Sequence, residues 1–349
     1  FAGTTRLVDL DPPASGYVAA LVNITMADTA GAGFVRGWGP AELRPNTSSL
    51  NVDAPASIVG NATVVALEDG KFVLESTTST RVVVDVMAFF EETGGTATSD
   101  DGRLIALEPA RLADTREPAG ELLDSGSSNP WSATDGGWDV DVLGEVGVPD
   151  DDTVAAVVLA LTAISDGGAG WAGAYPSGGT WSTTSNVNVA QRDLRNNLVI
   201  VPIDETGVVS FETFRVANLV VDVVAYVTSD AAEVDGVGLY SDVGPSREVD
   251  TRIDFGFGRL QAETTATAIV VAGASATLHN LTVTETSAAG HLAAHPDATV
   301  PFVSNLNWSG PNQTRGVLAI TRVSDLGDVS FTSLVATDLV VDAIGAFSS

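Results

Sequence analysis

A short apolar segment with one internal aspartate occurs three times in this chain, and it constrains the fold more than any other feature. The copies are residues 81–90 (RVVVDVMAFF), 218–227 (NLVVDVVAYV) and 338–347 (DLVVDAIGAF). A continuous Val/Leu run of this length is typical of a strand that is covered on both faces. An aspartate inside such a strand is costly to bury unless it is paired or hydrogen-bonded. Three such segments predict three copies of one module.

Two further anchors recur in the same register. A glycine precedes each aspartate by 52 residues, in the pairs Gly33 and Asp85, Gly170 and Asp222, and Gly290 and Asp342. Between these anchors lie the related segments Ser49-Leu50-Asn51, Ser185-Asn186-Val187-Asn188 and Ser304-Asn305-Leu306-Asn307. A period well above 100 residues indicates tandem domains rather than a solenoid.

Each copy has the pattern of an all-β domain. Turn residues interrupt short Val- and Thr-rich runs every 8–12 positions or so, as in sandwiches and barrels, and no convincing amphipathic helix is present. The polar stretches 91–102 and 228–236 are typical of linkers. We therefore predict three tandem antiparallel β-sandwich modules, jelly-roll-like, over residues 1–92, 103–228 and 237–349.

A fourth motif, Pro-x-Arg-x-x-Asp-Thr-Arg, opens the second and third modules at residues 109–116 and 245–252. The first module has no clear counterpart, so we expect it to lack one strand. That strand would come from residues upstream of Phe1 or from a neighbouring chain. The second alternative predicts self-association, with a head-to-tail polymer as its extended form.

The charge balance limits the partners. The chain has 45 acidic and 16 basic residues, with Lys71 as its single lysine, and a net charge of -29. Phosphate contacts need clustered Arg and Lys, so nucleic acid and anionic membrane surfaces are not expected partners. No apolar run is long enough to span a membrane, and the absence of cysteine excludes disulfides.

The chain carries none of the nucleophile or metalloprotease motifs, and we predict that it is not an enzyme. No cofactor is expected. The run Asp150-Asp151-Asp152 is interpreted as a solvated turn, and nothing fits an EF-hand. An irregular calcium site between loops stays open as an alternative, because oxygen ligands are plentiful.

The repeated motifs resemble a tandem β-rich module of secreted and cell-surface proteins of actinobacteria. Three stretches of the second module carry the resemblance: residues 114–116 (DTR), 185–188 (SNVN) and 221–226 (VDVVAY). The third module matches at 250–252, 304–307 and 341–347, and has His295-Pro296 where the second has Tyr175-Pro176. The resemblance implies an extracellular or cell-surface location and brings no catalytic residues.

The buried acids and the recurring asparagines are interpreted as structural. A planar guanidinium can bind a carboxylate at two points, so we expect Asp222 to pair with Arg116 and Asp342 with Arg252. Asp85 has no such partner in its own module unless Arg6 serves. Asn51, Asn188 and Asn307 are expected to bind the loop backbone.

Aromatic residues and two histidines are the candidates for ligand contact. Aromatic rings beside acids and amides suit sugar stacking, whereas core or module–module packing is the favoured interpretation. His291 and His295 lie four residues apart on one predicted strand and would need a third ligand, such as Asp297, to hold a metal. The candidates are Trp38, Trp171, Tyr175, Trp181, His291, His295 and Trp308.

The sequence thus predicts a non-catalytic, extracellular structural protein of the cell surface or of a surface fibre. The alternative is a carbohydrate- or cell-wall-binding region of a secreted hydrolase, with a glycan as its partner.

Overall fold

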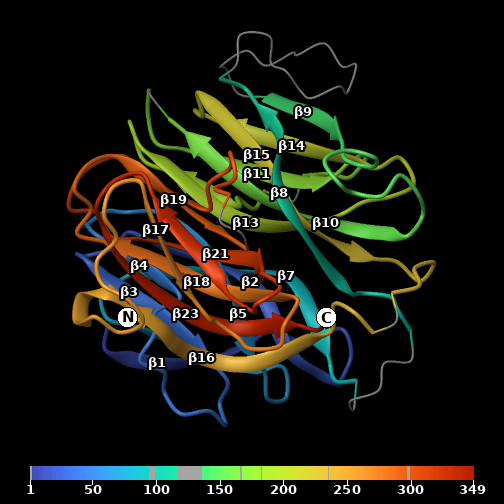
Figure 1. Ribbon diagram of the computed structural model, residues 1–349, viewed down its shortest axis with the longest axis horizontal. Coiled ribbons are helices and arrows are strands. Elements are labelled where there is room, and N and C mark those ends of the chain that lie inside the picture. Colours follow the sequence, from blue (N-terminus) through green and yellow to red (C-terminus); the bar gives the residue numbers. More distant parts are fainter. Residues whose placement is uncertain are drawn as a thin grey trace.

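The computed structural model describes residues 2–93, 99–116, 136–165, 167–181, 183–234, 236–296 and 299–349. Within these ranges the chain forms β-strands and one short 3-10 helix, η1 (Thr251–Ile253). The all-β prediction is confirmed. All of the strand pairs are antiparallel, and they form six small sheets, two from each third of the chain (Figure 1).

The first third forms a four-stranded and a three-stranded sheet. The four-stranded sheet has the order β1 (Thr4–Asp9), β6 (Lys71–Ser76), β3 (Gly33–Trp38) and β4 (Leu50–Val52). The three-stranded sheet has the order β5 (Val59–Ala66), β2 (Tyr17–Ala27) and β7 (Arg81–Glu91). The strand β7 carries the first copy of the aspartate segment.

The second third forms two four-stranded sheets. One has the order β13 (Leu194–Pro202), β10 (Val154–Ile164), β15 (Asn218–Thr228) and β8 (Leu104–Asp114). The other has the order β12 (Val187–Val189), β11 (Gly170–Pro176), β14 (Val208–Phe214) and β9 (Gly136–Asp141). The Asp-bearing strand β15 therefore lies between two neighbours, β10 and β8.

The final third repeats that plan. Its first sheet has the order β16 (Tyr240–Asp250), β23 (Asp338–Phe347), β18 (Ala276–Thr284) and β21 (Arg315–Arg322). Its second sheet has the order β17 (Thr264–Ala268), β22 (Val329–Ser333), β19 (Gly290–His295) and β20 (Leu306–Trp308). The first third follows the same order in both sheets, except that nothing corresponds to β8 and β16 in its described residues.

Each third has its own apolar core between its two sheets. The strands of three sheets have a second apolar face as well: Val22 packs into the core of the first third, whereas its neighbour Leu21 points the other way. Successive residues of a strand point to opposite faces, so an apolar run can serve two cores at once.

The second faces of these sheets meet in a fourth apolar cluster that draws on all three thirds. Leu21, Val158 and Leu278 represent the three thirds in it. Burying each of these aliphatic side chains contributes about 1.5–3 kcal/mol. In Figure 1 the strands of the middle third (green to yellow) lie above those of the final third (orange to red), which are drawn in front of the blue first third.

The shared cluster corrects the prediction of three tandem sandwich modules in one respect. The thirds are not separate bodies in a row: one sheet of each third faces the shared cluster, and the six small sheets form a propeller-like arrangement. The uninterrupted Val/Leu runs already indicated strands covered on both faces. What covers the second face is another third of the same chain.

Candidate functional site

The Asp-bearing strands of the second and final thirds are joined to the opening motif by buried ion pairs. In register, Asp222 of β15 faces Arg111 of β8, and Asp342 of β23 faces Arg247 of β16. Each arginine binds that aspartate through its Nε atom. The two aspartates are 2% and 1% exposed. A buried carboxylate needs such a partner, because an uncompensated buried charge is strongly destabilising.

The same two arginines also bind the aspartates of the Asp-Thr-Arg sequences. Nη1 of Arg111 lies 2.5 Å from Oδ2 of Asp114, and Nη1 of Arg247 lies 2.7 Å from Oδ2 of Asp250. The last arginine of each motif closes the group, with Nε of Arg116 2.8 Å from Oδ1 of Asp114. We call each set of two aspartates and two arginines a clamp.

The predicted partners of the buried acids were therefore wrong in detail. Asp222 and Asp342 are bound by the first arginine of the motif, Arg111 and Arg247, whereas Arg116 and Arg252 bind Asp114 and Asp250. The reason is strand length. β8 and β16 end at Asp114 and Asp250, so the final arginine lies beyond the paired segment.

The pKa values of the two carboxylates in a clamp are shifted in opposite directions. Burial raises the pKa of Asp222 and of Asp342 to about 6, although the neighbouring arginine lowers it. Hydrogen bonds from the Arg252 side chain lower the pKa of Asp250. One guanidinium shared between two acids favours the ionised form of the more solvated one.

The first third has the aspartate without the clamp. Asp85 lies in β7 across from Asn23 of β2, and its side chain is hydrogen-bonded to that of Asn23. Burial raises its pKa. Within the described ranges, no arginine forms an ion pair with Asp85, and Arg6 lies in β1 of the other sheet, paired with Leu74.

The Ser-x-x-Asn segments form small hydrogen-bonded loops at the start of β4, β12 and β20. Nδ2 of Asn51 lies 3.0 Å from Oγ of Ser48, Oγ of Ser185 lies 3.1 Å from Oδ1 of Asn188, and Nδ2 of Asn307 lies 2.9 Å from Oγ of Ser304. These asparagines therefore bond to the serine three residues earlier.

The expected hydrogen bond to the neighbouring backbone is made by a residue at a different position of the segment. Oδ1 of Asn186 accepts from the amide of Ala174, and Oδ1 of Asn305 accepts from the amide of Ala294. In the first third, Ser49 replaces the asparagine and accepts from Gly37. The prediction assigned this backbone contact to Asn51, Asn188 and Asn307 instead. The correct position was not recognised, because the first third has a serine at position 49 where the other two thirds have an asparagine.

Each of these loops also touches the preceding third of the chain, with the final third counted as preceding the first. Nδ2 of Asn280 lies 2.8 Å from the carbonyl oxygen of Ser48, and Nδ2 of Asn23 lies 3.2 Å from that of Ser185. The loop of the final third completes the cycle, with the amide of Asn307 2.8 Å from Oδ1 of Asn196. The three thirds are thus arranged cyclically.

Buried asparagines extend this network around the shared apolar cluster. Nδ2 of Asn197 lies 2.9 Å from Oδ1 of Asn23, and Nδ2 of Asn61 lies 3.1 Å from Oδ1 of Asn280. The two side-chain carbonyls of Asn197 and Asn61 also accept from the backbone amides of Ala62 and Leu318, each in another third. Buried amides that are satisfied in this way fix the relative position of the three thirds.

Charged side chains meet where the thirds join. Arg315 of the final third binds Asp53 of the first, and its Nη2 lies 3.7 Å from Oδ2 of Asp193 in the second. Burial lowers the pKa of nearby Arg195 to about 10, and the charge of Arg315 adds to this. The charges of these groups compensate one another, so the cluster connects the thirds and is not a free charged site.

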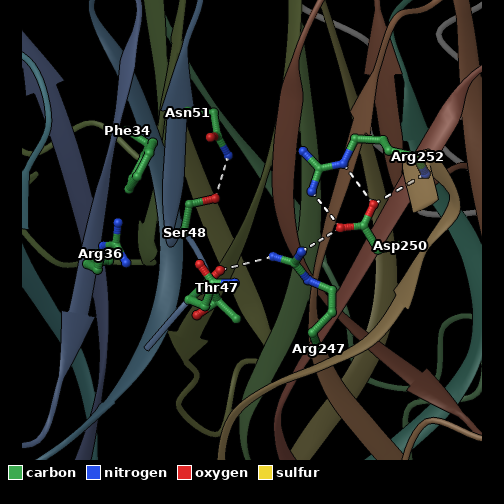
Figure 2. A pocket seen from close by; sticks show the side chains of 9 residues that line it. Phe34, Arg36, Thr47, Ser48, Asn51, Arg247, Asp250 and Arg252 are labelled. Carbon is green, nitrogen blue, oxygen red and sulfur yellow. Dashed lines mark hydrogen bonds and ion pairs between the residues drawn. The ribbon is translucent and has the colours of Figure 1, made fainter. Parts of the chain in front are cut away.

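A pocket of about 310 Å³ lies between the loop of the first third and the clamp of the final third. Figure 2 shows Phe34, Ser48 and Asn51 on one side and the Arg247–Asp250–Arg252 group on the other. Nη2 of Arg247 lies 3.3 Å from the carbonyl oxygen of Asn46, so the arginine joins the two sides. The guanidiniums that line the pocket, those of Arg36, Arg247 and Arg252, are each paired with a carboxylate.

The aromatic candidates divide into buried and partly exposed groups. Trp38, Trp308 and His295 are buried, and Nε1 of Trp308 lies 2.7 Å from the carbonyl oxygen of Ala288. Trp171, Tyr175 and Trp181 are half-buried. The rings of Trp171 and Trp181 stack with centroids 4.4 Å apart.

The histidines show no metal-binding geometry. Nε2 of His295 lies 3.0 Å from Oγ1 of Thr332, and His291 is half-buried across from Asn307. Asp297, the suggested third ligand, lies outside the described residues. Over those residues, no three His, Asp or Glu side chains come together as metal ligands do. The described part of the chain also has no helix long and apolar enough to cross a membrane.

Comparisons with known proteins give no family. No protein-family model and no curated protein matches the chain. A protein in the atomic structure of Sulfolobus Turreted Icosahedral Virus matches with 11% identity and a TM-score of 0.20, covering 99% of this chain and 84% of that one. A structure described as the triple jelly roll fold and turret assembly of an archaeal virus matches with 12% identity and a TM-score of 0.21, over 99% and 83%.

A third structure, YhhW from Escherichia coli, matches with 7% identity and a TM-score of 0.18, over 61% of this chain and 92% of that one. TM-scores near 0.2 do not define a common fold. The functional conclusions below therefore rest on the geometry of this chain.

Proposed function

We propose that this chain is a non-catalytic structural subunit that assembles with other chains outside the cell, at the cell surface or in a surface fibre. Each third would be a jelly-roll-like sandwich module, and the shared core would make the three modules one rigid block. The resemblance to the actinobacterial surface module supports the location.

One observation carries the proposal: in the part of the chain that the structure describes, the Asp-bearing sheet of the first third has one strand fewer than its two counterparts. β15 and β23 are flanked on both sides and buried, whereas β7 pairs only with β2 among the described residues. Val83 and Val86 of β7 are 49% and 40% exposed. An apolar strand with an unpaired edge is a template for pairing with another chain.

The oligomeric state tests this proposal. Analytical ultracentrifugation over a wide concentration range, with electron microscopy of the native material, should show ordered assemblies. Replacing Val83 with lysine places a charge on the open strand and should abolish them. Leu43→Lys, at a side chain that is 93% exposed, is the matched control. A chain that remains monomeric in every condition, including its native material, would overturn the proposal.

A second candidate function, carbohydrate binding, is favoured by the stacked Trp171 and Trp181 pair. Half-exposed aromatic rings present flat apolar faces of the kind that stack on sugars. A glycan array should then give specific hits that Trp181→Ala removes and Leu43→Ala retains. Absence of any hit, or hits that both variants retain, would exclude this site.

A further inference from the structure

We propose that the open edge of β7 binds an extended strand of a second polypeptide that carries the sequence Arg-x-x-Asp-Thr-Arg, with the first arginine of that strand bound to Asp85. This inference rests on the proposed assembly role and names the chemistry of the partner. The strand would complete the sheet as β8 and β16 complete the other two.

The strand order defines the position. β8 and β16 lie beside β15 and β23 in antiparallel register, and β7 holds the place of those two Asp-bearing strands in the first third. In both complete sheets the motif aspartate aligns two residues before the buried one, as in the pairs Val220–Asp114 and Val340–Asp250. The incoming aspartate would therefore lie opposite Val83, and the incoming arginine opposite Asp85.

The charge of Asp85 selects an arginine. In the two complete sheets the equivalent carboxylate is bound by Arg111 or Arg247. Among the described residues, Asp85 has the neutral amide of Asn23 as its side-chain hydrogen-bond partner. A guanidinium on the added strand would supply the charge-assisted bond that Asp222 and Asp342 already have.

The surroundings of β7 match those of its counterparts. β21 of the final third lies against both β15 and β8, and β13 of the middle third lies against β7 in the same way. The Ser185 loop of the middle third reaches Asn23, beside Asp85, as the Ser48 loop of the first third reaches Asn280, beside Asp342. The Ser48 loop also accepts Arg247 at the carbonyl oxygen of Asn46. An added strand would therefore meet β7 on one side and the middle third on the other.

The probe is a synthetic peptide with the sequence of residues 239–254, which spans β16 and the complete motif. Titration by calorimetry should give one site per chain. Hydrogen exchange should show slower exchange of β7 amides once the peptide is bound, with β15 and β23 unchanged. The peptide with Arg247→Ala should bind at least about tenfold more weakly, because it leaves Asp85 unpaired.

Protein variants assign the effect to Asp85. Asp85→Asn should bind the natural peptide at least about tenfold more weakly and should bind the two peptides with similar affinity. Asp69→Asn, which removes one exposed acid from a turn, is the matched control and should bind as the unchanged protein does.

Three results would overturn the inference. One is the absence of peptide binding while the protein still assembles; the assembly proposal then survives and another partner occupies β7. Another is equal affinity for the natural peptide and for the peptide with Arg247→Ala. The last is full protection of all β7 amides in the monomeric protein without any peptide, because the edge would then already be closed. A protein that never assembles, in contrast, contradicts the assembly proposal itself.

Discussion

β7 and β15 have nearly the same sequence pattern and opposite surroundings. Both are 11-residue strands with an aspartate at the fifth position. β15 is buried along most of its length, whereas β7 is partly or fully exposed throughout. The difference shows that the pattern specifies a central strand, and that the neighbour completing it must be provided separately.

The largest expected effect comes from removing the arginine of a complete clamp. Arg111→Ala leaves Asp222 buried without its partner and should lower the free energy of unfolding by about 3–5 kcal/mol. Denaturant unfolding followed by fluorescence measures this. Arg81→Ala, whose side chain lies at the surface beside Asp28, is the control and should change stability by less than about 0.5 kcal/mol. If Arg111→Ala lowered the free energy of unfolding by less than about 1 kcal/mol, Asp222 would not depend on its arginine, and β15 would not differ from β7 in this respect.

Native-state hydrogen exchange compares the strands directly. In the monomeric protein, the β7 amides that do not pair with β2 should exchange at least about 100-fold faster than the amides of β15 and β23, because they have no partner strand. Mass spectrometry of fragments or NMR can resolve the three strands. Similar protection in all three would show that β7 is covered.

A buried histidine makes the final third sensitive to acid. Burial lowers the pKa of His279 to about 3, and its ring nitrogens bond Thr277 and Thr321. The unfolded chain has a histidine pKa near 6.5, so below that pH it binds a proton that the folded chain does not. Stability should therefore fall by about 2 kcal/mol between pH 7.5 and pH 5 through this residue.

His279→Leu isolates that contribution, because Val22 and Leu159 occupy the same position in the other thirds. The variant should lack this part of the acid sensitivity when unfolding is measured at several pH values. An unchanged pH dependence would show that His279 is protonated in the folded chain.

The smallest expected effect concerns Asp85 itself. Its raised pKa means that the ionised form is disfavoured in the folded chain. Asp85→Asn should therefore raise stability near pH 7 by roughly 0.5 kcal/mol, a small value because the side chain is half-buried and screened by solvent. The difference in stability between the variant and the unchanged protein should disappear as the pH falls below the ordinary pKa of an aspartate. When the arginine-bearing strand is bound to β7, Asp85→Asn should instead lower the stability.

Much of this organisation could be predicted from the sequence because it is local or repeated. The strands follow from apolar runs and turn residues, and the three copies follow from anchors such as Gly33 and Asp85 in constant register. The three-stranded sheet that the first third forms within the described residues also agrees with the sequence, since the Asp-Thr-Arg motif occurs only twice.

The remaining features depend on contacts that a single module does not encode. The shared core could not be assigned, because Leu21 and Val22 are both apolar and the sequence does not say which third covers each face. Predicting the partners within the clamp required knowing where β8 ends, because the end of that strand determines whether Arg111 or Arg116 binds Asp222. The role of Asn186 was missed because its counterpart in the first third is Ser49.

The cyclic arrangement of the three thirds has a consequence for valency. A symmetric trimer of separate chains would offer either three open edges or none. Here the three repeats lie in one chain, and only the first of them has an unpaired Asp-bearing strand in the described residues. Because β8 and β16 are already paired with β15 and β23, a block with a single acceptor edge would take up one added strand per chain through β7.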